Sequence, residues 1–213
     1  MSKLYKATRP DGGSFRDPSV TWAVGETTRH PTSTAMVAND AATYLSVSDA
    51  PADCTGFVWP CRLFEVEPEG ETLTGMDYPH KVAGLTFRVI SELPAWQAFG
   101  PTGEAVEAFI ARCKRLTPDE VKRLDAALDA AWYAACYADR AAAWDAYRDA
   151  AWAADRAAAW DAARDAVKDA ARDAARDAAW YAARALLVRD KITPAQFDSL
   201  TKPWRDAGLE LPE

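Results

Sequence analysis

The sequence predicts an α+β protein: a small, mostly antiparallel sheet head, then a long Ala-rich helical region and a short C-terminal helix. Most of the prolines and all but two of the ten glycines lie in residues 1–100, where short runs alternate between apolar and polar residues as strands do. Between Pro118 and Pro194 there is no proline, and no glycine separates Gly103 from Gly208. We therefore divide the chain into an α+β head domain, 1–100, and a helical region, 104–206.

The head is expected to hold a sheet of four or five strands. The strand-like runs are residues 3–8, 20–24, 44–49, 57–67 and 82–93. The second run is expected to pair with the first, and Pro60 indicates a sheet edge or a bulge. Residues 33–44 fit a short helix with Ser33 or Thr34 near its N-terminal cap.

Two four-residue signals mark helix starts in the second half. Thr117-Pro118-Asp119-Glu120 and Thr193-Pro194-Ala195-Gln196 each place Thr before Pro and an acid or amide three residues later, as in a capping box. Residues 104–116 form an amphipathic helix before the first signal. The second signal opens a last helix, 194–206, that is ended or interrupted near Pro203 and folds back onto the long region.

An alanine repeat with a period of four runs through residues 125–185. Every fourth residue from Ala126 to Ala182 is alanine. Four residues overshoot one helical turn by about 40°, so this column circles the helix in roughly 36 residues. No single partner can follow it end to end. Either different neighbours contact different segments, or 118–190 breaks into two or more helices; unbroken, it would be roughly 110 Å long.

A second column of the repeat alternates aromatic and cationic residues. Exposed tryptophans in such number are typical of an interface, and Arg over an indole adds about 0.5–1 kcal/mol. The alternative to an interface is an expanded gene repeat that encodes a solvated helix. The predicted interface residues are Trp132, Trp144, Trp152, Trp160, Trp180, Arg148 and Arg156.

Charge and motifs exclude several functions. The net charge of −7 disfavours a nucleic-acid partner, which calls for a basic surface. No apolar leader and no span of about 18 apolar residues is present, so no membrane is expected. The four cysteines lack metal spacing and fit a reduced, cytoplasmic chain. No catalytic, metal or cofactor motif is found, and His30 and His80 are interpreted as surface-loop residues, with a general base as the alternative.

The chain resembles uncharacterised bacteriophage and actinobacterial proteins with an Ala/Asp/Arg/Trp tetrad-repeat tail. The resemblance rests on the opening LYKATRPDGGSF, the segment CRLFEVEPEGE and the AAAWDAARDA-type tail. It implies a cytoplasmic setting in a bacterial host cell and no established activity. The head also resembles the ADP-ribosyltransferase fold in its LYKAT strand and Ser33-Thr34, but the His and Glu placements of that fold are missing.

These observations favour a non-enzymatic, phage-encoded assembly protein. Its helical surface would bind copies of itself or a host or phage protein. The alternative is a nucleotide-binding or ADP-ribosyltransferase-like enzyme whose site lies in the head, near His80 and the strand ends. A third hypothesis, an acidic decoy of a host nuclease, is disfavoured because acids and bases in the repeat are nearly balanced.

Overall fold

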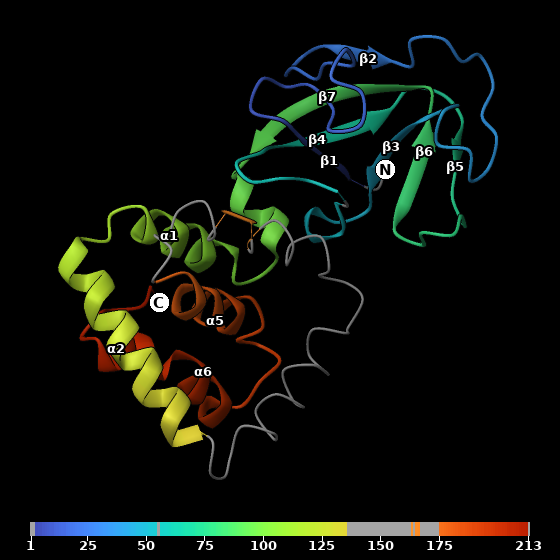
Figure 1. The fold of residues 1–213 in the computed structure, drawn as a ribbon. Coiled ribbons are helices and arrows are strands. Elements are labelled where there is room, and N and C mark those ends of the chain that lie inside the picture. Colours follow the sequence, from blue (N-terminus) through green and yellow to red (C-terminus); the bar gives the residue numbers. More distant parts are fainter. Residues whose placement is uncertain (1–2, 55, 136–162, 164, 167–174, 213) are drawn as a thin grey trace. The chain divides into compact units, whose positions relative to one another are not determined.

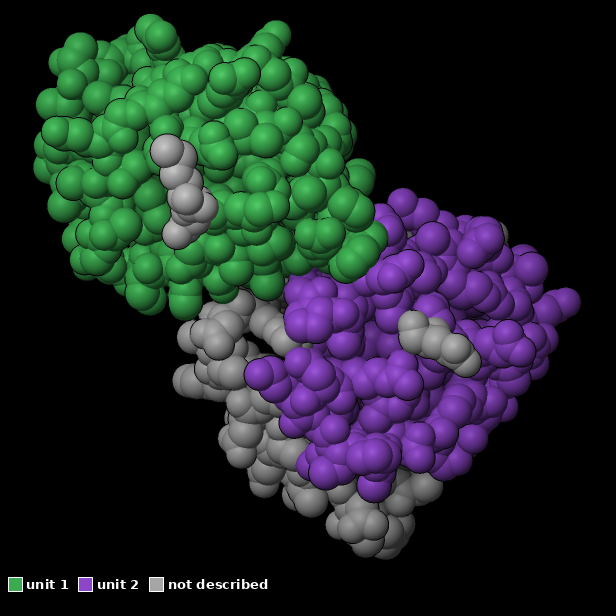
Figure 2. Space-filling view, turned by 180° about the vertical axis from the view of Figure 1, so that it is seen from behind, with its two compact units in different colours: residues 1–98 green, residues 99–213 purple. Residues whose placement is uncertain are grey.

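The computed structural model describes residues 3–54, 56–135, 163, 165–166 and 175–212. These divide into two compact units, which we call the head unit, 1–98, and the helical unit, 99–213 (Figure 2). The α+β class is confirmed, because strands occupy the head unit and helices the other. No helix among the described residues is long and apolar enough to cross a membrane.

The head unit is built on a seven-stranded sheet in which every pairing is antiparallel (Figure 1). The strand order is β2-β7-β4-β1-β3-β6-β5. The prediction of an antiparallel sheet is confirmed, with more strands than expected. The strands are β1 Leu4–Thr8, β2 Thr27–Arg29, β3 Leu45–Ser48, β4 Arg62–Pro68, β5 Thr72–Leu73, β6 Lys81–Gly84 and β7 Thr86–Leu93.

The core of the head unit lies against the sheet and includes one loop tryptophan. Trp22 is 1% exposed, packs 6.1 Å from Phe87 between ring centroids, and donates its indole N–H to the Ser14 hydroxyl at 2.8 Å. This hydrogen bond provides an acceptor for the N–H group of a buried indole. One other core member, Val20, comes from the same loop as Trp22. The rest come from alternate strand positions: Leu4, Leu45, Val47, Phe64, Val66, Phe87 and Val89.

Two predictions of secondary structure in the head are wrong. Residues 20–24 form no strand beyond an isolated bridge between Thr21 and Gly13. Residues 33–44 form turns, not a helix. There the Thr43 hydroxyl accepts from the Val37 N–H at 2.9 Å, and the Asp40 carboxylate accepts from Ala42 N–H at 3.1 Å. Such side-chain bonds give the backbone an alternative to helical hydrogen bonds.

Two further expectations need correction. The run 82–93 is two strands, β6 and β7, which part at Leu85 and pair with different neighbours. Pro60 marks no sheet edge: a cis Trp59–Pro60 peptide precedes β4, and β4 lies between β7 and β1 inside the sheet. The register shift in β4 falls instead between Glu65 and Val66.

The helical unit packs four described helices around an apolar core (Figure 1). They are α1 Gly103–Cys113, α2 Pro118–Ala135, α5 Arg176–Leu187 and α6 Pro194–Asp206, with η2 Ala95–Phe99 before them. Helix α6 contacts both α5 and α2, and α1 contacts α5. Phe109 of α1 and Trp204 of α6, both fully buried, lie 4.7 Å apart between ring centroids.

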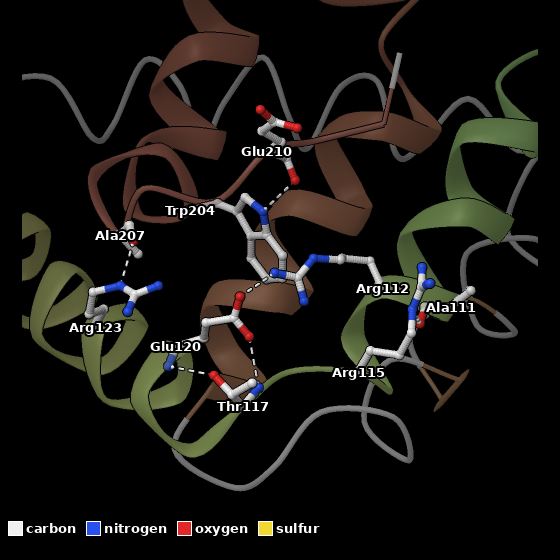
Figure 3. Close-up of polar contacts among 9 residues, drawn as sticks. All are labelled: Ala111, Arg112, Arg115, Thr117, Glu120, Arg123, Trp204, Ala207 and Glu210. Carbon is white, nitrogen blue, oxygen red and sulfur yellow. Dashed lines mark hydrogen bonds and ion pairs between the residues drawn. The ribbon is translucent and has the colours of Figure 1, made fainter.

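Both predicted helix starts are confirmed. The Thr117 N–H donates to Glu120 Oε2 at 2.7 Å, and the Glu120 N–H donates back to the Thr117 hydroxyl at 3.3 Å (Figure 3). Thr193 and Gln196 repeat the arrangement at the start of α6. The helix continues through Pro203 to Asp206, so the expected interruption is wrong. The segment after α6 is held against the helix, because Trp204 Nε1 donates to the Glu210 carbonyl at 3.1 Å (Figure 3).

The long helix is not found as a single rod in the described residues. Helices α2 and α5 are short and contact one another as well as α6, whereas a continuous helix would separate them by several tens of ångströms. The alanine column is exposed at Ala126 and Ala130 in α2, and buried at Ala178 and Ala182 in α5. The two ends of the column therefore differ in exposure to solvent.

Candidate functional site

The predicted interface residues are only partly within the described chain. Trp144, Arg148, Trp152, Arg156 and Trp160 lie outside the described residues. Trp132 lies in α2. Trp180 in α5 is partly buried, and the Arg184 guanidinium lies 4.8 Å from the centroid of its ring. The cation–aromatic contact at i, i+4 that the repeat predicts is confirmed at this one pair.

A cavity of about 430 Å³ in the head unit is the strongest candidate site. Its volume lies in the range of small-molecule sites, roughly 300–1,000 Å³. Five segments line it: β1, the loop that ends at Val20, the turn after β2, the turn before β3, and the start of β3. The residues are Lys6, Ser14, Arg16, Asp17, Val20, His30, Pro31, Thr32, Ala41, Ala42, Tyr44, Leu45 and Ser46.

Lys6 is the central cation of this cavity. It lies in β1 in the same alternation as Leu4, which belongs to the core, and its ammonium lies 5.3 Å from the centroid of the Trp22 ring. The ammonium donates to the Ser46 carbonyl at 2.9 Å. Burial lowers the pKa of Lys6 to about 8, because an apolar setting disfavours the charged form.

Two further cations belong with Lys6: Lys81, whose charge acts on it, and Arg16, which lines the same cavity. The charge of Lys81 in β6 helps to lower the pKa of Lys6, and the pKa of Lys81 is itself lowered by burial and by Arg16. Lys81 and Lys6 both line a recess of about 30 Å³ beside the cavity. No ion pair with a carboxylate is found for any of these three cations in the part of the chain that the structure describes. The three like charges therefore repel one another in the free protein.

His30 adds a directed hydrogen-bond donor. Its Nδ1 accepts from the N–H groups of Ser33, at 2.9 Å, and Thr32, at 3.3 Å. A neutral imidazole whose Nδ1 accepts carries its proton on Nε2. The one acid in the lining is Asp17, whose carboxylate accepts from the N–H and hydroxyl of Ser19. The interpretation of His30 as a plain loop residue missed this position.

His80, the other candidate, lies outside the cavity lining. Its Nδ1 is 3.4 Å from Asp49 Oδ2 and 3.6 Å from Asp53 Oδ2. His80 and Asp49 are half exposed, and the side chain of Asp53 is 15% exposed. The sequence places His80 between two predicted strands, and no local pattern in it links His80 to either carboxylate.

The buried thiols offer little nucleophilic chemistry. Cys54, Cys61 and Cys113 are buried thiols outside any disulfide. Burial raises the pKa of Cys54 to about 11 and that of Cys113 to about 12. A thiol must lose its proton to act as a nucleophile or metal ligand, so these two remain inert at neutral pH.

The sequence contained one overlooked signal for the cavity. Leu4, Lys6 and Thr8 alternate along β1 on one face, so a lysine occupies a position in phase with core residues. Its cross-strand partner is Phe64, a core residue. No known protein-family model, curated protein sequence or solved structure matches this chain.

Proposed function

We propose that the head unit binds a small phosphate-bearing ligand, of the nucleotide class, in the cavity around Lys6. The observation that carries the proposal is the convergence of Lys6, Arg16 and Lys81 without a carboxylate ion pair among the described residues. In a chain of net charge −7, such a local positive cluster is a feature of the site and not of the composition. It is arranged to attract an anion.

A bound phosphate would relieve the repulsion among these cations. Partly buried charges interact more strongly than exposed ones, because the effective dielectric constant is lower. An anion beside Lys6 would therefore offset the burial that lowers its pKa. The Nε2–H of His30 and the hydroxyls of Ser14 and Thr32 supply further hydrogen-bonding groups in the lining.

The remaining walls suit the uncharged part of a nucleotide. They are formed by Val20, Pro31, Ala41, Ala42, Tyr44 and Leu45. Mixed apolar walls with a few convergent polar groups are the usual composition of a ligand site. The alternative hypothesis of an ADP-ribosyltransferase-like head implies ligands of the same class, since NAD and ADP-ribose carry phosphates on an adenosine.

The test is calorimetric titration of the full chain with AMP, ADP-ribose, NAD and inorganic phosphate. At least one should bind to the wild type. Lys6→Met should weaken that binding by at least tenfold, about 1.4 kcal/mol. Affinity should also fall above pH 8, because Lys6 then loses its charge. The matched control is Lys122→Met, on exposed helix surface in α2, which should bind like the wild type.

Two results would reject the proposal. One is no binding of any of the four ligands to the wild type at millimolar concentration. The other is equal affinity in the wild type and in Lys6→Met, which would place the ligand elsewhere.

A second candidate function is self-association through the alanine column. It is favoured by the exposure of Ala126 and Ala130 on α2, since small side chains let a second helix approach closely. The tryptophans and arginines predicted for this interface stay a prediction, as does a cytoplasmic, phage-encoded setting. Light scattering of the full chain should give a multiple of 23.3 kDa that Ala126→Glu and Ala130→Glu together reduce to a monomer. A monomeric wild type at 100 micromolar or so would reject this candidate.

A further inference from the structure

Asp49, Asp53 and His80 form a cluster that the sheet holds in place. Ser48, at the end of β3, is in register with Lys81, the first residue of β6. Asp49 and His80 are the next residues outward on either side, and the Asp49 N–H donates to the His80 carbonyl at 3.1 Å. Asp53 ends η1, Pro51–Asp53, where its carbonyl accepts from the Ser48 hydroxyl at 2.9 Å. All three residues are therefore positioned by backbone contacts.

The spacing of the three side chains fits co-ligands better than it fits a hydrogen-bonded pair. One ring nitrogen of His80 lies 3.4 Å and 3.6 Å from two carboxylate oxygens. Strong hydrogen bonds to nitrogen are shorter, about 2.7–3.2 Å, and a single proton cannot point at both acceptors. Two ligand atoms at about 2.05 Å from a tetrahedral ion are about 3.3 Å apart, close to the separations seen here.

We infer that Asp49, Asp53 and His80 bind one divalent first-row transition ion, with Zn²⁺ as its representative. A ligand atom from each residue lies within 4.8 Å of the other two, and the half-exposed Asp49 carboxylate can rotate to close the remaining distance. Imidazole nitrogen suits zinc and its neighbours, whereas Mg²⁺ and Ca²⁺ take oxygen ligands. Octahedral Mg²⁺ would also draw neighbouring ligands to about 3.0 Å.

The charge of the cluster supports a cation. Two carboxylates face one imidazole, which must be neutral to act as a ligand. Three protein ligands leave a fourth position of a tetrahedral ion open to solvent or to a further ligand. The ion would tie the turn after β3 to the turn before β6.

The experiment uses the full chain after treatment with a chelator. Titration with Co²⁺, a spectroscopic substitute for Zn²⁺, should give visible d–d bands with one-to-one stoichiometry and no thiolate charge-transfer band. Zn²⁺ should displace the cobalt and raise the thermal midpoint, because an ion that binds only the folded state stabilises it. Mg²⁺ at the same concentration should do neither.

Variants locate the site. His80→Gln and Asp53→Asn should each weaken Co²⁺ binding by more than tenfold. The matched controls are His30→Gln, the other histidine, and Glu71→Gln, an exposed acid of the same unit, and both should bind like the wild type. Circular dichroism of each variant without metal checks that the sheet is intact, and Asp49→Asn serves if one of the first two fails to fold.

Three outcomes would overturn the inference. Cobalt spectra that are unchanged by His80→Gln would place the ion elsewhere. A thiolate band would assign it to a cysteine. Stabilisation by Mg²⁺ or Ca²⁺ equal to that by Zn²⁺ would show a general effect of divalent charge. Phosphate or nucleotide binding is read out separately and does not enter any of these results.

Discussion

At the scale of single residues, Lys6 is held where its charge is costly. An aliphatic side chain at this inward position of β1 would pack on Trp22 without losing hydration. The structure instead places an ammonium there, with the Ser46 carbonyl as a hydrogen-bond acceptor and a pKa lowered to about 8. Residues that reduce stability in this way are typical of functional sites.

Lys6→Met should therefore stabilise the free protein at pH 7, on the order of 1 kcal/mol. The sign follows from proton linkage. A lysine whose folded pKa is about 8, below its ordinary 10.5, binds fewer protons when folded between those values. The free energy of unfolding of the wild type therefore rises relative to that of the variant between pH 8 and pH 10.5. Urea unfolding of the wild type and the variant at pH 7 and pH 10 measures the difference in stability at each pH. A difference that is equal at pH 7 and pH 10 would contradict the lowered pKa of Lys6.

Glu120 illustrates a carboxylate with the opposite shift. The Thr117 N–H, which donates to it, and the Arg112 guanidinium lower its pKa from 4.5 to about 2 (Figure 3). A lowered carboxyl pKa contributes stability that is present above pH 4.5 and is lost as pH falls toward 2.

Glu120→Gln should consequently be less stable than the wild type at pH 6, with the gap closing between pH 4.5 and pH 2. Urea unfolding at several pH values in that range measures it. The capping box of α6 serves as a control, because it uses the neutral Gln196. Gln196→Ala should lower the free energy of unfolding by the same amount at each pH. A gap that stays constant for Glu120→Gln would contradict the shifted pKa.

At the scale of elements, β6 and β7 are separated by one residue and depend on a glycine for their packing. A Cβ added at Gly84 would lie 2.6 Å from Cζ of Phe87, a ring that is fully buried in the core. Glycine is required here by close approach, since only a hydrogen fits between the strand backbone and the ring.

Gly84→Ala should destabilise the head unit by about 1–3 kcal/mol, the usual cost of overpacking. Phe87→Leu opens space at the contact, so the alanine should cost less in that background. A double-mutant cycle by chemical denaturation gives the coupling. An equal cost of Gly84→Ala with Phe87 and with Leu at position 87 would show that the ring is not the obstacle.

The elements also show what the sequence could predict. Both capping boxes and the bounds of α6 follow from residues three or four apart, so local chemistry sufficed. The turns at 33–44 were missed because Thr43 and Asp40 bond to nearby backbone groups, which a count of apolar residues does not register. His80 is brought to Asp49 and Asp53 by the pairing of β3 with β6, which no local pattern specifies.

At the scale of the whole molecule, the chain forms two units with separate cores. Val66 is fully buried in the core of the head unit, and Val106 in α1 is fully buried in the helical unit. Each unit is close to the size of a typical small domain. The long rod expected from the tetrads is replaced, in the described helices, by compact packing of α2 and α5 on α6.

Differential scanning calorimetry should accordingly show two transitions. Val66→Ala and Val106→Ala each remove two buried methyl groups. Each should lower the free energy of unfolding by about 2 kcal/mol, including the cost of the cavity. Each should lower one transition by several degrees and leave the other in place. A single transition that both variants lower equally would show that the units unfold together.

The setting of Lys6 has one consequence for chemical labelling. A lysine amine attacks acylating reagents only when it is unprotonated, and a pKa of about 8 leaves a sizeable fraction of Lys6 in that form near neutral pH. The pKa of Lys3, three residues earlier, is raised by Glu65, so its amine stays protonated there. A compact activated ester that enters the cavity should modify Lys6 ahead of Lys3, and a spectroscopic tag could thus be attached at the proposed site without any substitution.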